Sequence, residues 1–374
     1  MKHTERRLRI AIAGALFAGL ALSPKLWLSE RVYPATPVLA ILRPIPAPLD
    51  YILYGTLLAM LVAIAIVERP ARLIGTFVAM AIAISLFDQS RWQPWFYQYL
   101  VMLAAVGFCE RNSALNTCRL VVVCTYFWSG LQKANLDFVH NVFPFMMGSW
   151  AGLVPAWMGF GAPFVEVAIG IGLLTRRFRT YAIYAGIAMH AFILLAIGPF
   201  GSNSNSVVWP WNIAMICFLM LLFWRQPELS PREMVWPREG VYQKVVLIFF
   251  GIVPLLSFFN LWDGYLSSAL YSGVRNTGVV YVSDALKERL PKEIVEHVYP
   301  SNKPGTGILI LREWSMSELN AGIYPEPRIY KSLARHICTY THDPSEMKLW
   351  IKQSNVLFSA DSQVSYDCPA LAPH

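Results

Sequence analysis

The chain of 374 residues carries 31 Lys and Arg against 23 Asp and Glu, which gives a net charge of +8 at neutral pH. Only 14% of the residues are charged and 56% are hydrophobic, whereas about a quarter of an ordinary soluble domain is charged. So much apolar surface excludes intrinsic disorder and disfavours a soluble enzyme. The charge is also too sparse for a nucleic-acid-binding face, and no nucleic acid partner is expected.

The two parts of the chain differ in charge. Residues 1–264 contain 20 basic and 12 acidic residues and hold the whole excess, whereas residues 265–374 contain 11 of each sign. The first part has the composition of a membrane region and the second that of a water-soluble module. We therefore predict a transmembrane domain over residues 1–264 and a soluble C-terminal domain over residues 265–374.

Nine segments meet or approach the length of about 20 mostly apolar residues that a helix needs to cross a bilayer. They are residues 8–28, 50–67, 71–88, 94–109, 115–133, 159–175, 180–199, 207–224 and 243–263. The first segment also has features of a signal peptide, but it lacks a small-residue cleavage site followed by polar sequence, and we favour a retained span. The fold expected is an all-α polytopic membrane bundle of about nine transmembrane helices.

Basic residues indicate the orientation, because loops on the cytoplasmic side collect Lys and Arg. With the N-terminus inside and nine alternating spans, 15 basic residues fall on the cytoplasmic side and five fall outside. We therefore expect a protein of a bacterial-type inner (cytoplasmic) membrane. The lipid bilayer surrounds its spans, its N-terminus lies inside, and its C-terminal domain lies outside.

The C-terminal domain has the pattern of a small α/β fold. Runs rich in Val, Ile, Leu, Tyr and Trp predict strands over residues 278–283, 306–312 and 347–352. Residues 284–299 and 326–338 are predicted to be helical.

Six cysteines occur without a CxxC motif or a Cys/His metal spacing, so neither a thiol redox centre nor a metal is expected. Cys338 and Cys368 both fall in the exported domain, where an oxidising compartment permits a disulfide. The sequence leaves open whether the two are bonded, and they are a disulfide candidate.

Three ionisable residues fall at membrane depth, where a buried charge is costly and is a functional candidate by default. Lys133 ends the fifth span and is either a partly desolvated base or a lysine whose ammonium reaches the interface. Glu166, in the Gly-rich sixth span, either pairs with another buried group or makes a helix-packing hydrogen bond. His190, in the middle of the seventh span, is either a satisfied core residue or a partner of Glu166.

Two polar stretches rich in tryptophan lie at the outer side of the predicted bundle, Asp88–Trp95 and Ser202–Asn212. Tryptophans at a membrane face usually form an aromatic belt, but a belt does not account for the interleaved Asn, Ser and Gln. Together with Lys133, these stretches indicate a pocket that opens outward and has aromatic walls and a few polar groups.

Residues 126–138 read Tyr-Phe-Trp-Ser-Gly-Leu-Gln-Lys-Ala-Asn-Leu-Asp-Phe. This motif resembles the segment Tyr-Phe-x-Ala-Gly-x-Lys-Lys-Leu-Asp-x-Asp-Trp of the vitamin K-dependent γ-carboxylases and their bacterial relatives, the horizontally transferred transmembrane (HTTM) domain proteins. Lys133 falls on the second lysine. In the carboxylases this lysine is the base that deprotonates vitamin K hydroquinone, and the resemblance implies the same role for Lys133.

Weaker matches follow the same order along the chain, and the resemblance covers roughly residues 70–225. Residues 87–92 are similar to the family's Leu-Asp-Lys-x-x-Trp, and Tyr97 matches a tyrosine further on. Glu166 and His190 match an acidic residue and a histidine of the following spans.

The chain departs from that family at several positions. Gln132 stands in place of the first paired lysine, and Asn135 in place of the next aspartate. Where the carboxylases have Asn-Asn-His after the tryptophan, residues 93–95 read Gln-Pro-Trp. The resemblance therefore implies quinol-dependent chemistry and does not favour glutamate carboxylation itself.

From the resemblance we expect a membrane enzyme that uses a reduced quinone, menaquinone or ubiquinone, and oxygen to modify an exported peptide, protein or small substrate. The expected catalytic residues are Lys133, His190 and Glu166. The residues expected to bind substrate or quinone are Asp88, Trp92, Tyr97, Tyr126, Trp128, Trp211 and Asn212.

Two other functions stay open. A non-catalytic maturation or immunity partner of an exported peptide, built on the same scaffold, would tolerate substitution of Lys133 and His190. A quinone oxidoreductase subunit similar to DoxX- and MauE-type proteins would reduce quinone without forming an epoxide.

Overall fold

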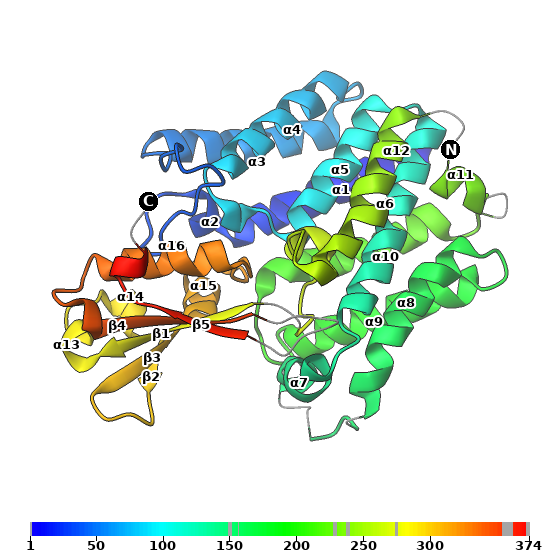
Figure 1. Ribbon diagram of the computed structural model, residues 1–374. Helices are drawn as coiled ribbons and strands as arrows, with labels where there is room; N and C mark the ends of the chain where they lie inside the picture. The colour runs from blue at the N-terminus through cyan, green and yellow to red at the C-terminus, as the bar shows by residue number, and fades with distance from the viewer. Residues whose placement is uncertain are drawn as a thin grey trace. The chain divides into compact units, whose positions relative to one another are not determined.

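Figure 1 shows the computed structural model of the chain. The residues that it describes are 2–148, 152–155, 157–226, 230–236, 240–273, 276–353 and 362–371. The chain folds into two compact units, each assembled from three segments. Unit 1 comprises Met1–Leu22, Leu53–Ala83 and Pro94–Val274, and unit 2 comprises Ser23–Ile52, Ile84–Gln93 and Arg275–His374.

Unit 1 is helical, as expected for apolar segments whose backbone must satisfy its own hydrogen bonds in a bilayer. Its long helices are α1 (Lys2–Leu22), α5 (Pro94–Phe108), α6 (Arg111–Gln132), α8 (Trp157–Leu174), α9 (Arg179–Ile197) and α10 (Trp209–Phe223). Most of α3 (Leu49–Ile66) and α4 (Ala71–Leu86) also belongs to it. Its shorter helices are η2 (Phe138–Val142), α7 (Phe143–Met147), η4 (Ser206–Val208), α11 (Pro231–Val235) and η7 (Tyr265–Ser267).

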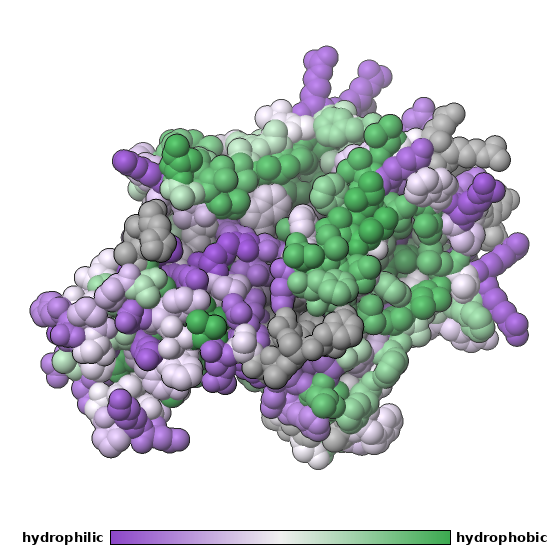
Figure 2. Space-filling model, in the orientation of Figure 1, coloured by the Kyte–Doolittle hydropathy of each residue, from purple (hydrophilic) through white to green (hydrophobic). Residues whose placement is uncertain are grey.

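The last apolar segment of unit 1 changes its hydrogen-bond pattern twice. It begins as α12 (Val241–Val246), continues as the π-helix η5 (Leu247–Ile252) and ends as the 3₁₀-helix η6 (Val253–Phe259). Figure 2 shows hydrophobic residues covering the visible face of α12 and its continuation. Exposed apolar side chains there include Val245, Ile248 and Phe249. This surface suits contact with lipid chains.

Five segments are long and apolar enough to cross a membrane. They are Leu49–Ile66, Trp157–Leu174, Arg179–Ile197, Ser206–Phe223 and Val241–Phe259. Each of the nine predicted spans contains a helix, but α4 and α5 are shorter, and α1 and α6 carry several charged or polar residues. The chain is therefore a mostly helical membrane protein, as predicted, whereas the count of nine spans stays a prediction.

Unit 2 contains one antiparallel sheet of five strands in the order β2-β3-β1-β4-β5. The strands are β1 (Thr277–Ser283), β2 (Val298–Pro300), β3 (Thr306–Ile310), β4 (Met347–Gln353) and β5 (Ser362–Tyr366). In the register, Val280 of the central strand lies opposite Leu309 and Leu349, and all three are buried. The helices α15 (Leu311–Leu319) and α16 (Pro327–Cys338) pack against this sheet.

The three predicted strands correspond to β1, β3 and β4, while β2 and β5 were not predicted. Residues 284–299 form two short helices, α13 (Asp284–Lys287) and α14 (Lys292–Val295), followed by β2. The prediction of helix is therefore confirmed for parts of this stretch and wrong for its last residues, which begin β2. Pro291 lies between the two helices, and its ring and missing N–H interrupt a helix.

Two early segments of the chain are built into unit 2, including α2 (Pro24–Trp27) and η1 (Gln89–Arg91). The backbone nitrogens of Val32 and Tyr33 donate to the Glu318 carboxylate at 2.6 and 3.0 Å. Gln93 Nε2 donates to the Gly322 carbonyl at 2.9 Å. Unit 2 therefore contains residues from both sides of the predicted domain boundary between residues 264 and 265. The boundary itself stays a prediction.

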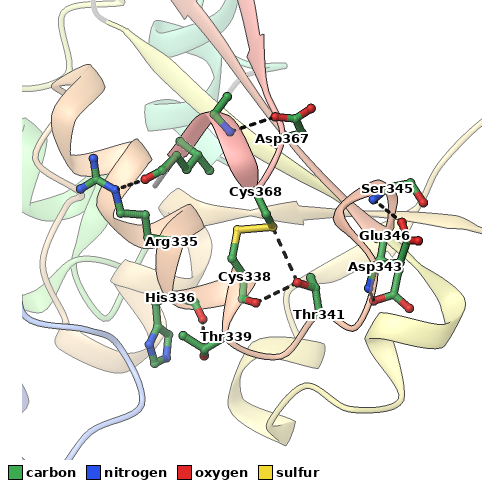
Figure 3. The surroundings of a disulfide bond; sticks show 12 residues. Arg335, His336, Cys338, Thr339, Thr341, Asp343, Ser345, Glu346, Asp367 and Cys368 are labelled. Atoms are coloured by element: carbon green, nitrogen blue, oxygen red, sulfur yellow. Dashed lines mark hydrogen bonds between the residues drawn. A yellow bond between two sulfur atoms is a disulfide. The ribbon is translucent and has the colours of Figure 1, made fainter. Parts of the chain in front are cut away.

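A disulfide closes the C-terminal end of unit 2 (Figure 3). It joins Cys338, the last residue of α16, to Cys368, with their Cα atoms 5.7 Å apart. The hydroxyl of Thr341 donates to the Cys338 carbonyl at 2.8 Å and lies 3.8 Å from Cys368 Sγ. The bond ties the chain after β5 to the helix that covers the sheet.

Candidate functional site

Helices α6 and α8 approach each other closely because a glycine of each lies at their contact. A Cβ atom at Gly130 would lie 2.6 Å from the Pro163 carbonyl oxygen and 2.7 Å from the Val167 nitrogen. One at Gly170 would lie 3.0 Å from the Phe127 nitrogen. Small residues allow such backbone contact between membrane helices. Polar side chains at the end of α6 are therefore brought against α8.

An ion pair joins these two helices. Lys133 directly follows α6, and its Nζ lies 3.1 Å from Oε2 of Glu166 in α8. Nζ also donates to the carbonyl oxygen of Ser129 at 3.2 Å and to the Ser129 hydroxyl. The two charged side chains are only 7% and 10% exposed. The ammonium is therefore directed into the protein, where it neutralises a buried carboxylate.

A second polar chain links α6, α9 and α10. The Tyr126 hydroxyl oxygen lies 2.6 Å from Nε2 of His190, and Nδ1 of His190 lies 2.8 Å from Oδ1 of Asn212. Asn212 Nδ2 donates to the Val208 carbonyl at 2.9 Å, which leaves Oδ1 to accept from His190. The imidazole therefore carries its proton on Nδ1, and its Nε2 accepts the proton of the Tyr126 hydroxyl.

Both ring nitrogens of His190 are thus occupied by partners other than Glu166. The direct contact expected between His190 and Glu166 is not among the hydrogen bonds of the described residues. The sequence placed the two at similar depth, but it could not show that Tyr126 and Asn212 reach the ring first.

Both polar groups face one cavity of about 80 Å³ inside unit 1. Its apolar wall consists of Met146, Met189, Ile193, Ile197, Val208, Met215 and Leu270. Its polar lining consists of Thr125, Tyr126, Ser129, Lys133, Glu166, His190, Trp211, Asn212 and Tyr271. A volume of this size holds several water molecules, and the three flexible methionines can adjust to a planar ligand.

The segment after η7 closes one side of the cavity with Leu270 and Tyr271. Asn135 Nδ2 donates to the Ser272 carbonyl at 2.7 Å, and Asn205 Nδ2 donates to the Tyr271 hydroxyl. Sequence reasoning missed Leu270 and Tyr271 because it assigned them to the soluble domain, and no local signal marks them. It also missed Ser129, although its spacing of four from Lys133 puts both on one helix face.

The structure brings six of the predicted site residues to this cavity. They are Tyr126, Lys133, Glu166, His190, Trp211 and Asn212. Two others lie elsewhere in unit 1. The ring of Trp128 packs 6.2 Å from that of Phe258, and the Tyr97 hydroxyl lies 3.5 Å from the Ser268 hydroxyl.

Asp88 and Trp92 belong to unit 2 and do not line the cavity. The fully buried Asp88 forms an ion pair with Arg31 and accepts from the Ser90 nitrogen at 3.0 Å. Burial alone would raise the pKa of Asp88, but the guanidiniums of Arg31 and Arg91 hold it below its ordinary value. Trp92 Nε1 donates to the Ser85 carbonyl at 3.1 Å. Both residues therefore serve the packing of unit 2.

The arrangement in unit 1 is suited to moving protons in an apolar surrounding. It places a lysine–carboxylate pair and a tyrosine–histidine–asparagine chain on the walls of one cavity. Among the described residues, no three His, Cys, Asp or Glu side chains are grouped as a metal site would require.

Comparisons with known proteins found a similarity over part of the chain. No family model matches the chain, and no solved structure matches it. The chain is 30% identical over 115 residues to protoheme IX farnesyltransferase of Pseudarthrobacter chlorophenolicus. That stretch covers 29% of this chain and 34% of the other protein, so the chain spans about a third of the curated relative that it matches.

Proposed function

We propose that the chain is a membrane enzyme that uses a reduced quinone and oxygen for an oxidative modification, in the manner implied by its resemblance to the vitamin K-dependent γ-carboxylases and HTTM proteins. The observation that carries the proposal is the convergence of Lys133, Glu166, Tyr126 and His190 on one cavity. These residues come from three helices, and each of the four was expected at the site from sequence.

Lys133 and Glu166 provide the first proton acceptor. In the resting ion pair the proton is on Nζ, 3.1 Å from the carboxylate oxygen. When Nζ passes that proton to Oε2, the amine becomes neutral and accepts a proton from a hydroxyl group in the cavity. Ser129 holds Nζ in place through its carbonyl and hydroxyl oxygens.

The side chains that line the cavity provide the kinds of contact that a quinol ring takes. Methionine, isoleucine and tryptophan side chains offer apolar and aromatic contact, while the polar groups lie where ring hydroxyls need partners. A reduced quinone, when bound, would supply the electrons that reduce oxygen and would itself become the epoxide, with release of one water. The mostly apolar lining would limit the contact of this chemistry with water.

The composition of unit 2 supports the predicted orientation. Its three segments must lie on one side of the membrane, so an even number of crossings must separate them. Two of the predicted spans lie between the first and second segments, and six lie between the second and third. A disulfide in this unit favours the oxidising side of the membrane. We place the N-terminus inside a bacterial-type inner membrane and unit 2 outside, where it meets an exported peptide or protein substrate.

The test supplies purified protein in lipid nanodiscs with menaquinol or ubiquinol and oxygen, and follows quinone epoxide by mass spectrometry. Wild type is expected to form epoxide, and Lys133→Ala to abolish it. Lys133→Ala leaves Glu166 buried without its partner, which costs about 3–5 kcal/mol and endangers folding. The neutral double variant Lys133→Met/Glu166→Gln avoids that cost and should be folded and inactive.

Lys244→Ala is the matched control, because Lys244 lies in α12 and does not line the cavity. Its epoxide formation should equal that of wild type. Epoxide formation by the folded double variant at the wild-type rate would exclude Lys133 as the base. Oxidation of the supplied quinol to quinone without epoxide would instead indicate a quinone oxidoreductase subunit.

A second candidate is a transferase of isoprenoid groups, which the 115-residue similarity to protoheme IX farnesyltransferase favours. Incubation with farnesyl diphosphate and protoheme distinguishes the two, since only a transferase consumes the diphosphate.

A further inference from the structure

The cavity has two polar walls, and the side chains of each wall form hydrogen bonds with different residues. Lys133 and Glu166 form one wall, and Tyr126 with His190 forms the other. Tyr126 lies in α6 and Lys133 directly follows it, so seven residues of helical rise separate their Cα atoms by about 10 Å along the axis. No hydrogen bond of the described residues joins the two walls.

We infer that Tyr126, His190 and Asn212 are a second proton-accepting arm, which takes the proton of the second ring hydroxyl of the bound quinol. This inference rests on the proposed function and identifies the path by which the second proton leaves.

The direction of the hydrogen bonds gives this arm its role. Asn212 accepts from Nδ1 of His190, which leaves Nε2 as the only basic nitrogen of the ring. Nε2 lies 2.6 Å from the Tyr126 oxygen, so that hydroxyl occupies it, and both side chains line the cavity. His190 therefore accepts a cavity proton through Tyr126, whose oxygen receives a proton as it gives up its own.

Asn212 is the positioning residue of the arm. Its amide cannot turn over without losing the bond to the Val208 carbonyl, so it keeps its oxygen toward the imidazole. An oxygen at Nδ1 also stabilises the imidazolium that forms when Nε2 is protonated.

The proton and electron balance is complete with two arms. One ring hydroxyl loses its proton to Lys133 Nζ, after Nζ has passed its own proton to Glu166 Oε2. The other hydroxyl loses its proton to the Tyr126 oxygen while the Tyr126 proton passes to His190 Nε2. Both O–H bonds of the ligand break, one atom of O2 becomes the epoxide oxygen, and the other atom leaves as water with the two protons that the arms return. Quinol and O2 thus give quinone epoxide and water.

The experiment measures kcat and KM for oxygen-dependent oxidation of reduced 2-methylnaphthoquinone by the full chain in nanodiscs. Tyr126→Phe and His190→Gln should each lower kcat about 100-fold, the usual worth of general-base catalysis, with KM changed less than about threefold. Because the two residues act in series, the double variant should be no slower than either single variant. Gln243→Leu, a fully buried amide away from the cavity, should match wild type.

A spectroscopic measurement separates positioning from mere packing. In protein with ¹⁵N-labelled histidine, the His190 signal should show the neutral Nδ1–H form in wild type and a mixture of both neutral forms in Asn212→Leu. A wild-type spectrum with the proton on Nε2 would overturn the inference.

Kinetics provide the other decisive outcomes. If wild type oxidises the quinol but the Tyr126 and His190 effects multiply in the double variant, the two act independently and the inference fails while the proposed function stands. An increase in KM with unchanged kcat would show that Tyr126 and His190 only bind the ligand, and the inference would likewise fail. If wild type oxidises no reduced quinone, the proposed function fails and the second arm fails with it.

Discussion

Replacing Gly130 with alanine is expected to damage both the packing of α6 on α8 and the site between them. The added Cβ would lie 2.6 Å from the Pro163 carbonyl oxygen, about 0.8 Å short of the 3.4 Å at which ordinary contact begins. Two of the three nearest atoms belong to the backbone of α8, so no side-chain rotation relieves the overlap. The helices must separate, at a cost of about 1–3 kcal/mol.

A cost of this size should lower the unfolding midpoint by about 2–6 °C for a chain of this length, which thermal unfolding in nanodiscs measures. Separation also lengthens the contact between Lys133 and Glu166, and quinol turnover should fall together with stability. Gly161→Ala in α8 is the matched control, because nothing lies within 4 Å of its added Cβ. It should be neutral or gain up to about 1 kcal/mol from helix propensity. If Gly130→Ala is as stable as Gly161→Ala, the close approach of the helices is refuted.

Three further predictions concern unit 2. Reducing the disulfide between Cys338 and Cys368, which are 30 residues apart, should lower the free energy of unfolding by about 3–4 kcal/mol, seen by calorimetry with and without reductant. A hydrogen bond from Arg289 lowers the pKa of Glu346 to about 2. Its stabilisation is complete above pH 4.5 and is lost as the pH falls toward 2, so the gap in denaturation midpoint between wild type and Glu346→Gln should close over that range. Asp88→Asn leaves its buried arginine partner uncompensated and should cost about 3–5 kcal/mol in denaturant titrations, without changing quinol affinity.

The helical segments of this protein could be predicted from sequence because each is a local apolar run. The assembly of unit 2 could not, because its contacts join residues that no local pattern connects. The nitrogen of Val32 binds Glu318, 286 positions away. Asp88 was expected at the site because it lies in a polar stretch on the predicted outer side and in a segment that resembles the family's, and only the structure shows its ion pair with Arg31.

The candidate site was more predictable than the fold around it. Lys133, Glu166 and His190 are ionisable groups in apolar segments. Because burying a charge there costs free energy, their positions alone identify them as candidate site residues. Their hydrogen-bond partners could not be predicted, because the amide of Asn212 reaches His190 only through the packing of α9 on α10. Tyr271 carries no signal at all, because its place at the cavity depends on the path of a loop.

The three-segment construction of unit 2 also sets an order of events during synthesis. About 180 residues separate Gln93 from the start of the C-terminal segment, which at 5–20 residues per second takes about 10–40 s to translate. During that interval the backbone amides of Val32 and Tyr33 cannot form their hydrogen bonds to Glu318, and Gln93 cannot form its bond to Gly322. Unit 2, whose first segment follows directly after Leu22, is therefore completed only when the last part of the chain has been made. A nascent chain that stalls in between exposes both early segments of unit 2 to proteases and chaperones.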